Sequence, residues 1–88
     1  MGDRERQTES TSVDAANYAV ARHLKAERVR RGLLQADLAE KTGLAINTIR
    51  RLESGEREMK FSQLFAIAEA LGVSPGAFID AAQAAMRE

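Results

Sequence analysis

Four glycines, Gly32, Gly43, Gly55 and Gly72, divide the chain into segments in which apolar residues recur at every third or fourth position. This spacing is typical of amphipathic helices, and glycine suits the left-handed position that follows a helix. The sequence has one proline and no alternating run of β-branched residues, so the usual signals of strands are missing. The chain is therefore predicted to be all-α.

Five helices are expected from this pattern. The first begins near Ser12 and stops at Gly32, the second covers residues 35–42, the third residues 46–53, and the fourth ends at Gly72. Ser74 and Pro75 open a fifth helix over about residues 75–87, because the serine oxygen can cap and the proline lacks an N–H that the first helical position does not use. The residues expected on the inward face of the first helix are Val13, Ala16, Val20 and Leu24.

Residues 1–11 contain no aliphatic side chain after Met1 and mix charges with Ser, Thr and Gln. Such a composition cannot bury enough apolar area to offset the entropy lost on ordering. A disordered tail is predicted here, and residues 12–88 are assigned to one domain.

Several classes of function are excluded by size and composition. At 88 residues the chain has room for one small core. It has no cysteine and a single histidine, His23, so disulfides, thiolate nucleophiles and multi-histidine metal sites are not available. There is no recognisable catalytic triad, phosphate-binding glycine loop or long apolar run. We expect a cytoplasmic, non-enzymatic protein that uses no metal or cofactor and does not bind a membrane.

Residues 35–53 have the pattern of two short helices joined by a tight turn at 43–45. Ala39 is small where the two helices would cross, Gly43 can adopt a positive φ in the turn, and Ile49 returns an apolar side chain to the core. These features together fit a helix-turn-helix, in which the second short helix is presented to a groove of DNA.

From Leu24 to Ile79, nearly two-thirds of its length, the chain resembles the lambda-repressor-like, Cro-type helix-turn-helix family. The likeness is carried by LKAERVRRGLLQADLAEKTGLAINTIRRLESGE and by LFAIAEALGVS. The resemblance implies a five-helix DNA-binding domain of bacterial or phage type, with helix 46–53 in the major groove. The elements in register are Arg28, Gln35, Leu38, Ala39, Gly43, Thr48, Ile49, Glu53 and Gly55.

The resemblance also implies roles for the matched residues. Gln35 looks like the family's phosphate-binding glutamine, with a glutamine merely exposed on the first helical turn as the alternative. Asn47 could pair with adenine, Arg50 could reach guanine, and Ala45 or Ile46 could pack on thymine methyl groups. For Arg50 and its neighbour, phosphate contact and a solvated face stay open. The full DNA-binding set is Gln35, Ala45, Ile46, Asn47, Thr48, Arg50, Arg51 and Arg57, in which Thr48 also counts with Leu38, Ile49 and Leu52 among the packing residues.

Arg28 and Glu53 look like the family's interior ion pair, and we assign them a structural role because an unpaired buried charge is costly. The sequence departs from the family where Ser or Thr commonly caps the second, third and fourth helices. Leu34, Ala45 and Lys60 occupy these positions, and each missing cap costs roughly 0.5–2 kcal/mol. Met59 stands where a proline is common.

Charge is balanced over the whole chain but not along it. The 13 basic and 13 acidic side chains cancel, whereas residues 15–60 hold an excess of basic ones. The excess is modest, so a monomer should bind DNA weakly at physiological salt. The last helix is apolar nearly all round, which suggests that one stripe packs on the fourth helix and another on a second chain, through Ile79 and Met86. A terminal helix packed within a monomer is the alternative.

The leading functional prediction is a sequence-specific transcriptional regulator of repressor type that binds double-stranded DNA as a homodimer. The second is an antitoxin, which binds its own operator and also a toxin protein. A third hypothesis is an adaptor protein that uses the fold without binding DNA. It is less favoured because it assigns no role to Gln35 and Arg50. The operator, the regulated genes and any controlling ligand or partner are not readable from the sequence.

Overall fold

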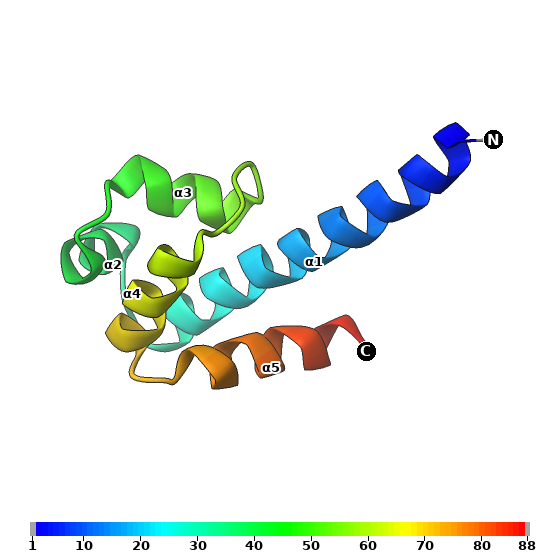
Figure 1. Cartoon of the computed structure of the whole chain (residues 1–88). Helices are drawn as coiled ribbons and strands as arrows, with labels where there is room; N and C mark the ends of the chain where they lie inside the picture. The colour runs from blue at the N-terminus through cyan, green and yellow to red at the C-terminus, as the bar shows by residue number, and fades with distance from the viewer. Residues whose placement is uncertain (1, 88) are drawn as a thin grey trace.

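The computed structural model describes the backbone of residues 2–87 and the side chains of residues 13–87. Within this range the chain forms five helices and no strands, as the all-α prediction requires (Figure 1). In chain order they are α1 (Gly2–Arg30), α2 (Gln35–Thr42), α3 (Ile46–Ser54), α4 (Phe61–Leu71) and α5 (Pro75–Met86). The later boundaries lie close to those expected, whereas α1 is assigned from Gly2 and not from near Ser12. The disordered tail predicted for residues 1–11 falls outside the residues that are described in full.

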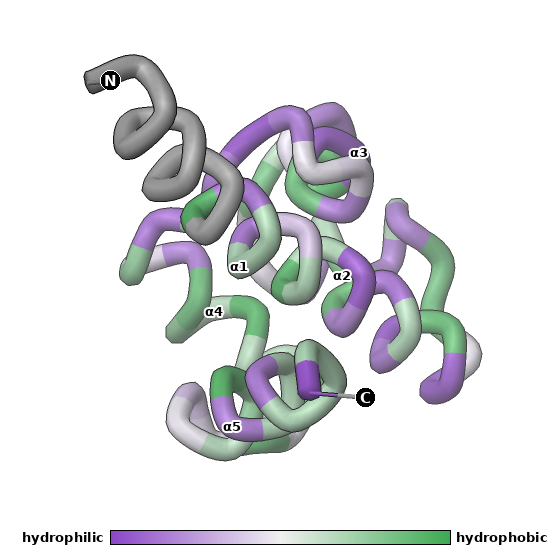
Figure 2. Tube along the Cα trace, turned by 90° about the vertical axis from the view of Figure 1, so that its right-hand side faces the viewer, coloured by the Kyte–Doolittle hydropathy of each residue, from purple (hydrophilic) through white to green (hydrophobic). Residues whose placement is uncertain are grey.

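α1 is the central element of the fold. α3 packs on one side of it and α5 on the other, while α2 and α4 close the end of the domain (Figures 1 and 2). Each helix contributes at least one fully buried large apolar side chain to the core. The six are Leu24, Leu38, Ile49, Leu52, Ile67 and Phe78. Burial of each is worth about 1.5–3 kcal/mol, so the small core depends on all five helices.

Two of the unusual helix starts are stabilised by the side chain three residues into the helix. The carboxylate of Asp37 accepts a hydrogen bond from the backbone N–H of Leu34 at 2.8 Å. In the same way, the side-chain oxygen of Gln63 accepts the N–H of Lys60 at 2.9 Å. Each of these bonds is one of the two that form a capping box, so it recovers part of the stability lost because Ser or Thr is missing at the cap. α3 has no side-chain cap at Ala45.

The inward face expected for α1 is only partly correct. Leu24 is buried and Val20 packs against the core, but Val13 and Ala16 are exposed. The reason is that these two residues line an open groove beside α4 rather than a packed interface.

α5 packs more extensively on α1 than on α4, which corrects the expectation that α4 would be its main support. Phe78 and Ala82 form its buried stripe. The ring of Phe78 meets the ring of His23 edge to face, with centroids 4.9 Å apart. His23 is therefore half-buried between helices and not on the helix surface where the sequence placed it.

Among residues 2–87, no single helix is long and apolar enough to cross a membrane, and α4 with α5 reaches that length only across a 95° bend. Among residues 13–87, whose side chains are described, no group of three or more metal-ligating side chains comes together.

Candidate nucleic-acid interface

The turn between α2 and α3 is fixed by local hydrogen bonds. Gly43 has a φ of 75°, a backbone conformation that is strained for residues with a Cβ. Its N–H donates a hydrogen bond to the carbonyl of Ala39 at 2.9 Å. The hydroxyl of Thr42 donates to the carbonyl of Leu38 at 2.8 Å and accepts the N–H of Leu44 at 3.2 Å. The chain therefore reverses sharply into α3, whose orientation relative to α2 is set by the turn.

α3 has one buried face and one exposed face. Ile49 and Leu52 are buried in the core, and Ala39 of α2 is small enough to let the two helices approach closely. Thr48 is half-buried between the two faces. The exposed residues at the start and on the outer side of α3 are Ala45, Ile46, Asn47, Arg50 and Arg51. α3 itself lies on the side of α1 opposite α5 (Figure 1).

On this exposed face, the guanidinium of Arg50 donates a hydrogen bond of 3.4 Å to the side-chain oxygen of Asn47. The two residues lie one helical turn apart, so they form a donor-rich pair at the surface. Arg51 lies 4.0 Å from the carboxylate of Glu56, and both of these side chains are well exposed, so solvent screens the attraction. Arg57 is exposed in the loop that follows α3.

A buried ion pair joins α1 to the end of α3. Arg28 donates two hydrogen bonds to Glu53, from Nε to Oε2 at 2.5 Å and from a terminal nitrogen to Oε1 at 2.9 Å. It donates a third to the carbonyl of Leu33 at 2.7 Å. The hydrogen bonds to Glu53 raise the pKa of Arg28, against the effect of burial. Both charges are buried and paired, so this pair holds the end of α3 against α1 and is not exposed on the surface.

Gln35 is attached to the same pair. Its side-chain nitrogen donates to Oε1 of Glu53 at 3.1 Å, and the residue is half-buried at the first position of α2. An amide nitrogen carries two N–H groups, so one remains for a phosphate oxygen beside the backbone N–H groups that begin α2. The sequence offered no signal for this link, because the two residues are 18 positions apart.

Asn17 is a further positioning residue that the sequence analysis missed. Its side-chain amide donates to the carbonyl of Gly55 at 2.9 Å. Gly55 ends α3 with a φ of 82°. A Cβ at this glycine would meet its neighbours only at ordinary contact distances of 3.9 Å or more, so the backbone conformation is the constraint. The bond holds the C-terminal end of α3 against α1.

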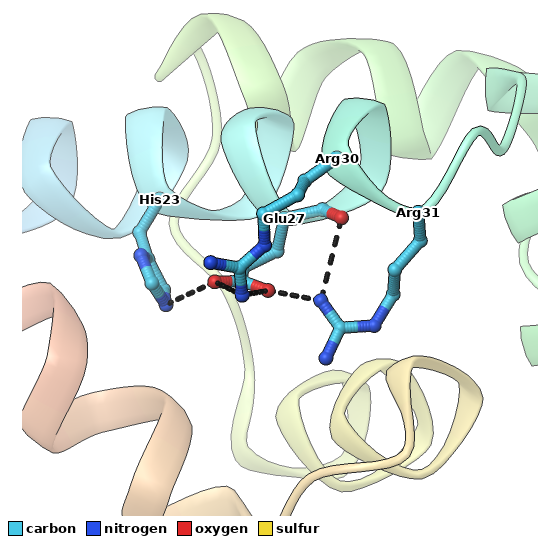
Figure 3. A network of polar contacts seen from close by, with 4 residues as sticks. All are labelled: His23, Glu27, Arg30 and Arg31. Atoms are coloured by element: carbon cyan, nitrogen blue, oxygen red, sulfur yellow. Dashed lines mark hydrogen bonds and ion pairs between the residues drawn. The ribbon is translucent and has the colours of Figure 1, made fainter.

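Part of the basic charge at the end of α1 is neutralised within the domain. Glu27 accepts hydrogen bonds from Arg30 and from Arg31, and it lies 3.8 Å from Nε2 of His23 (Figure 3). Burial raises the pKa of the Glu27 carboxyl, but the hydrogen bonds and charges of Arg31 and Arg30 outweigh it and hold that pKa below its usual value. The two arginines therefore share one carboxylate, which leaves one positive charge on this cluster.

Comparisons with known proteins agree with this geometry. The helix-turn-helix family matches residues 24–78, more than half of the chain. No curated protein is significantly similar to it in sequence. Among solved structures, it is similar to the clp gene regulator ClgR of Corynebacterium glutamicum, with 25% identity, a TM-score of 0.77 and coverage of 82% of this chain and 77% of the other.

Two restriction-modification controller proteins are also similar. C.AhdI from Aeromonas hydrophila shares 26% identity at a TM-score of 0.67, over 69% of this chain and 92% of its own. A point mutant of C.Esp1396I shares 26% identity at a TM-score of 0.78, over 83% of this chain and 92% of its own. With the turn, the buried ion pair and the exposed face of α3, these matches show that the chain belongs to the lambda-repressor-like helix-turn-helix family of DNA-binding transcriptional regulators.

Proposed function

We propose that this protein is a cytoplasmic, sequence-specific repressor of bacterial or phage type, which inserts α3 into the major groove and binds its operator as a homodimer. The observation that carries the proposal is the division of α3 into two faces. Ile49 and Leu52 lock one face into the core, while the other offers amide, guanidinium and small apolar groups to solvent. A rigidly held helix of this kind can read base edges.

The residues divide into those that read bases and those that grip the backbone. Asn47 and Arg50 have the hydrogen-bonding groups for adenine and guanine, and Ile46 has the exposed apolar surface for a thymine methyl group. Gln35 and Arg57 lie at the two ends of the unit, where phosphates of the same groove would pass. Ala45 adds apolar surface at the start of α3. Arg51 and Thr48 complete the proposed set, the first as a further backbone contact and the second at the edge of the core.

The proposal includes a homodimer because one short helix makes few contacts with DNA. The net basic charge of residues 15–60 is small, and the single carboxylate of Glu27 pairs with both Arg30 and Arg31. Two α3 helices about 34 Å apart would read both halves of a near-palindrome and multiply two weak affinities. Ile79 and Met86 of α5, exposed at 41% and 48%, are the proposed contacts between copies.

An antitoxin is the competing proposal. The exposed apolar side chains outside α3 favour a protein contact of some kind, and a toxin is one such partner. Co-expression with the product of the neighbouring gene separates the two: an antitoxin copurifies with a stable protein partner, and a simple repressor does not.

Selection of bound sequences from random duplexes tests the proposed function. The wild-type protein should enrich a near-palindrome with half-sites about 10 base pairs apart. Arg50→Ala should enrich the same spacing with relaxed choice at defined positions. Lack of any enrichment by the wild-type protein would contradict sequence-specific recognition.

A further inference from the structure

The loop between α3 and α4, residues 55–60, begins against α1 (Figure 1). The side-chain amide of Asn17 donates a hydrogen bond of 2.9 Å to the carbonyl of Gly55, and Asn17 is half-buried at this contact. A Cβ at Gly55 would lie 3.9 Å from side-chain carbons of Tyr18 and Ala21, so the backbone of Gly55 lies close to α1. The first residue of the loop is therefore held by the first half of α1.

Two further hydrogen bonds tie the loop to the end of α3. The backbone N–H of Arg57 donates to the carbonyl of Arg51 at 3.3 Å. The N–H of Glu56 donates to the hydroxyl of Ser54, also at 3.3 Å. The backbone that leads to Arg57 is thus attached to α3 by its N–H groups and to α1 by the carbonyl of Gly55.

Three consecutive charged residues follow Gly55, and their signs alternate. Glu56 lies 4.0 Å from Arg51, and Glu58 lines the hollow beside α1. Arg57 is exposed and makes no ion pair with the other side chains of residues 13–87. Only the middle charge attracts a phosphate, so the position of this loop decides whether a guanidinium or a carboxylate approaches a DNA backbone.

We propose that Asn17 is a positioning residue for DNA binding, which holds the loop through Gly55 so that Arg57 meets the phosphate backbone. The inference rests on the proposed function, in which Arg57 grips a phosphate beside α3. Asn17 acts through the loop and not on DNA itself, because its half-buried amide is directed at Gly55.

The place of Asn17 in the chain makes this support a feature of the long α1. The helix-turn-helix family matches residues 24–78, and Asn17 comes before that range. Asn17 also lines the hollow of about 250 Å³ beside the loop, together with Val13, Ala16 and Val20 of α1. The matched segment alone therefore lacks the group that holds the carbonyl of Gly55.

A loop that is ordered before binding should hold a phosphate more tightly than a loose one. A side chain that has to be ordered on binding loses conformational entropy, and this loss lowers the affinity. The bond from Asn17 orders the backbone of the loop when the protein folds. If this is how Asn17 acts, removing Arg57 should also remove most of the effect of Asn17 on binding, because the two residues then contribute through one contact.

A double-mutant cycle on duplex DNA of random sequence tests the inference, since a phosphate contact acts on any sequence. The proteins are the wild type, Asn17→Ala, Arg57→Ala, the double variant and the matched control Gln83→Ala, which removes an exposed amide from α5. Alanine suits the interior of a helix, and circular dichroism checks that each variant is folded.

Arg57→Ala should weaken binding roughly 10-fold, and the slope of log affinity against log salt should fall by about 0.9 for each copy bound. Asn17→Ala should lower both the affinity and the slope, although it removes no charge. Added to Arg57→Ala, it should weaken binding by less than about twofold. Gln83→Ala should bind like the wild type.

Exchange of backbone amide hydrogens tests the loop in the absence of DNA. In Asn17→Ala the N–H of Arg57 should exchange faster than in the wild type, because the loop opens more often. The N–H of Gly43, which donates to Ala39 at 2.9 Å, is the internal control and should exchange at the same rate in both proteins.

Three results would overturn the inference and leave the proposed function standing: an Asn17→Ala protein that binds DNA like the wild type, losses of affinity that are additive in the double variant, or unchanged exchange at Arg57. A wild type that binds no DNA would contradict the proposed function, and with it the role of Asn17 in binding, even if exchange at Arg57 is faster in Asn17→Ala.

Discussion

The side-chain amide of Gln35 donates a hydrogen bond to the carboxylate of Glu53, with the nitrogen 3.1 Å from the oxygen. The other oxygen of that carboxylate accepts from the buried guanidinium of Arg28. A residue expected to touch DNA phosphate is thereby joined to the ion pair that positions α3. The proposed phosphate contact and the placement of α3 would therefore depend on one hydrogen-bonded unit.

Arg28→Ala should lower the free energy of unfolding by about 3–5 kcal/mol, because Glu53 would be left buried without its charged partner. The exposed Arg50→Ala should change it by less than about 0.5 kcal/mol. Urea denaturation of both variants makes the comparison. If Arg28→Ala unfolds like the wild type and loses DNA affinity instead, Arg28 is a contact residue and the structural assignment is wrong.

Gln35→Ala should weaken binding to the operator and to random DNA by a similar factor, since phosphate contacts carry no sequence information. Fluorescence anisotropy at several salt concentrations measures the affinity of Gln35→Ala and of the wild type for both duplexes. A loss confined to the operator would place Gln35 among the residues that read bases.

Glu27 should contribute a pH-dependent share of stability. Because the pKa of its carboxyl is lowered in the folded protein, its contribution is fully present above the ordinary value of 4.5 and is lost as pH falls through the folded pKa. Wild type should therefore be more stable than Glu27→Gln near neutral pH, and the difference should shrink below pH 4.5. Thermal melts across this range test it, and a gap that stays constant in acid would argue against the pairing with Arg30 and Arg31.

Leu34→Ser should stabilise the domain by roughly 0.5–1 kcal/mol. The serine oxygen could accept a free N–H at the start of α2, and Asp37 already accepts the N–H of Leu34, so the substitution completes a capping box. Leu34 is 68% exposed, so little buried apolar area is lost. Leu34→Ala provides the control, since it removes the same side chain without adding a cap. Equal stability of the two variants would show that α2 gains nothing from the cap.

The helices could be predicted because their signals are local. Gly43, Gly55 and Gly72 end helices where glycine permits the left-handed backbone, and Ser74 caps α5 through a bond of 3.0 Å to the N–H of Ala77. The packing of α5 was harder to predict, because its alanine-rich sequence could pack against several partners. Only the assembled fold selects α1 over α4 as the main support of α5.

The site residues could be predicted where the resemblance aligned them with the family's motif. Contacts between side chains that are distant in the sequence could not be predicted. The exposed positions of α3 follow from helical spacing. The bond from Gln35 to Glu53 and the bond from Asn17 to Gly55 depend on distances between residues 18 and 38 positions apart, which no local pattern encodes. The pairing of Arg30 and Arg31 with the single carboxylate of Glu27 likewise depends on side-chain geometry that a count of charges does not contain.

The most direct test of the account is the specificity of Asn47→Ala and Arg50→Ala, measured as the ratio of affinities for the operator and for random DNA at one salt concentration. If α3 reads the major groove, each substitution should reduce this ratio about 5- to 150-fold, which corresponds to about 1–3 kcal/mol, and relax the choice of base at particular positions. Affinity for random DNA should change little for Asn47→Ala, which removes no charge. An equal loss of affinity for both duplexes would contradict the placement of α3 in the major groove.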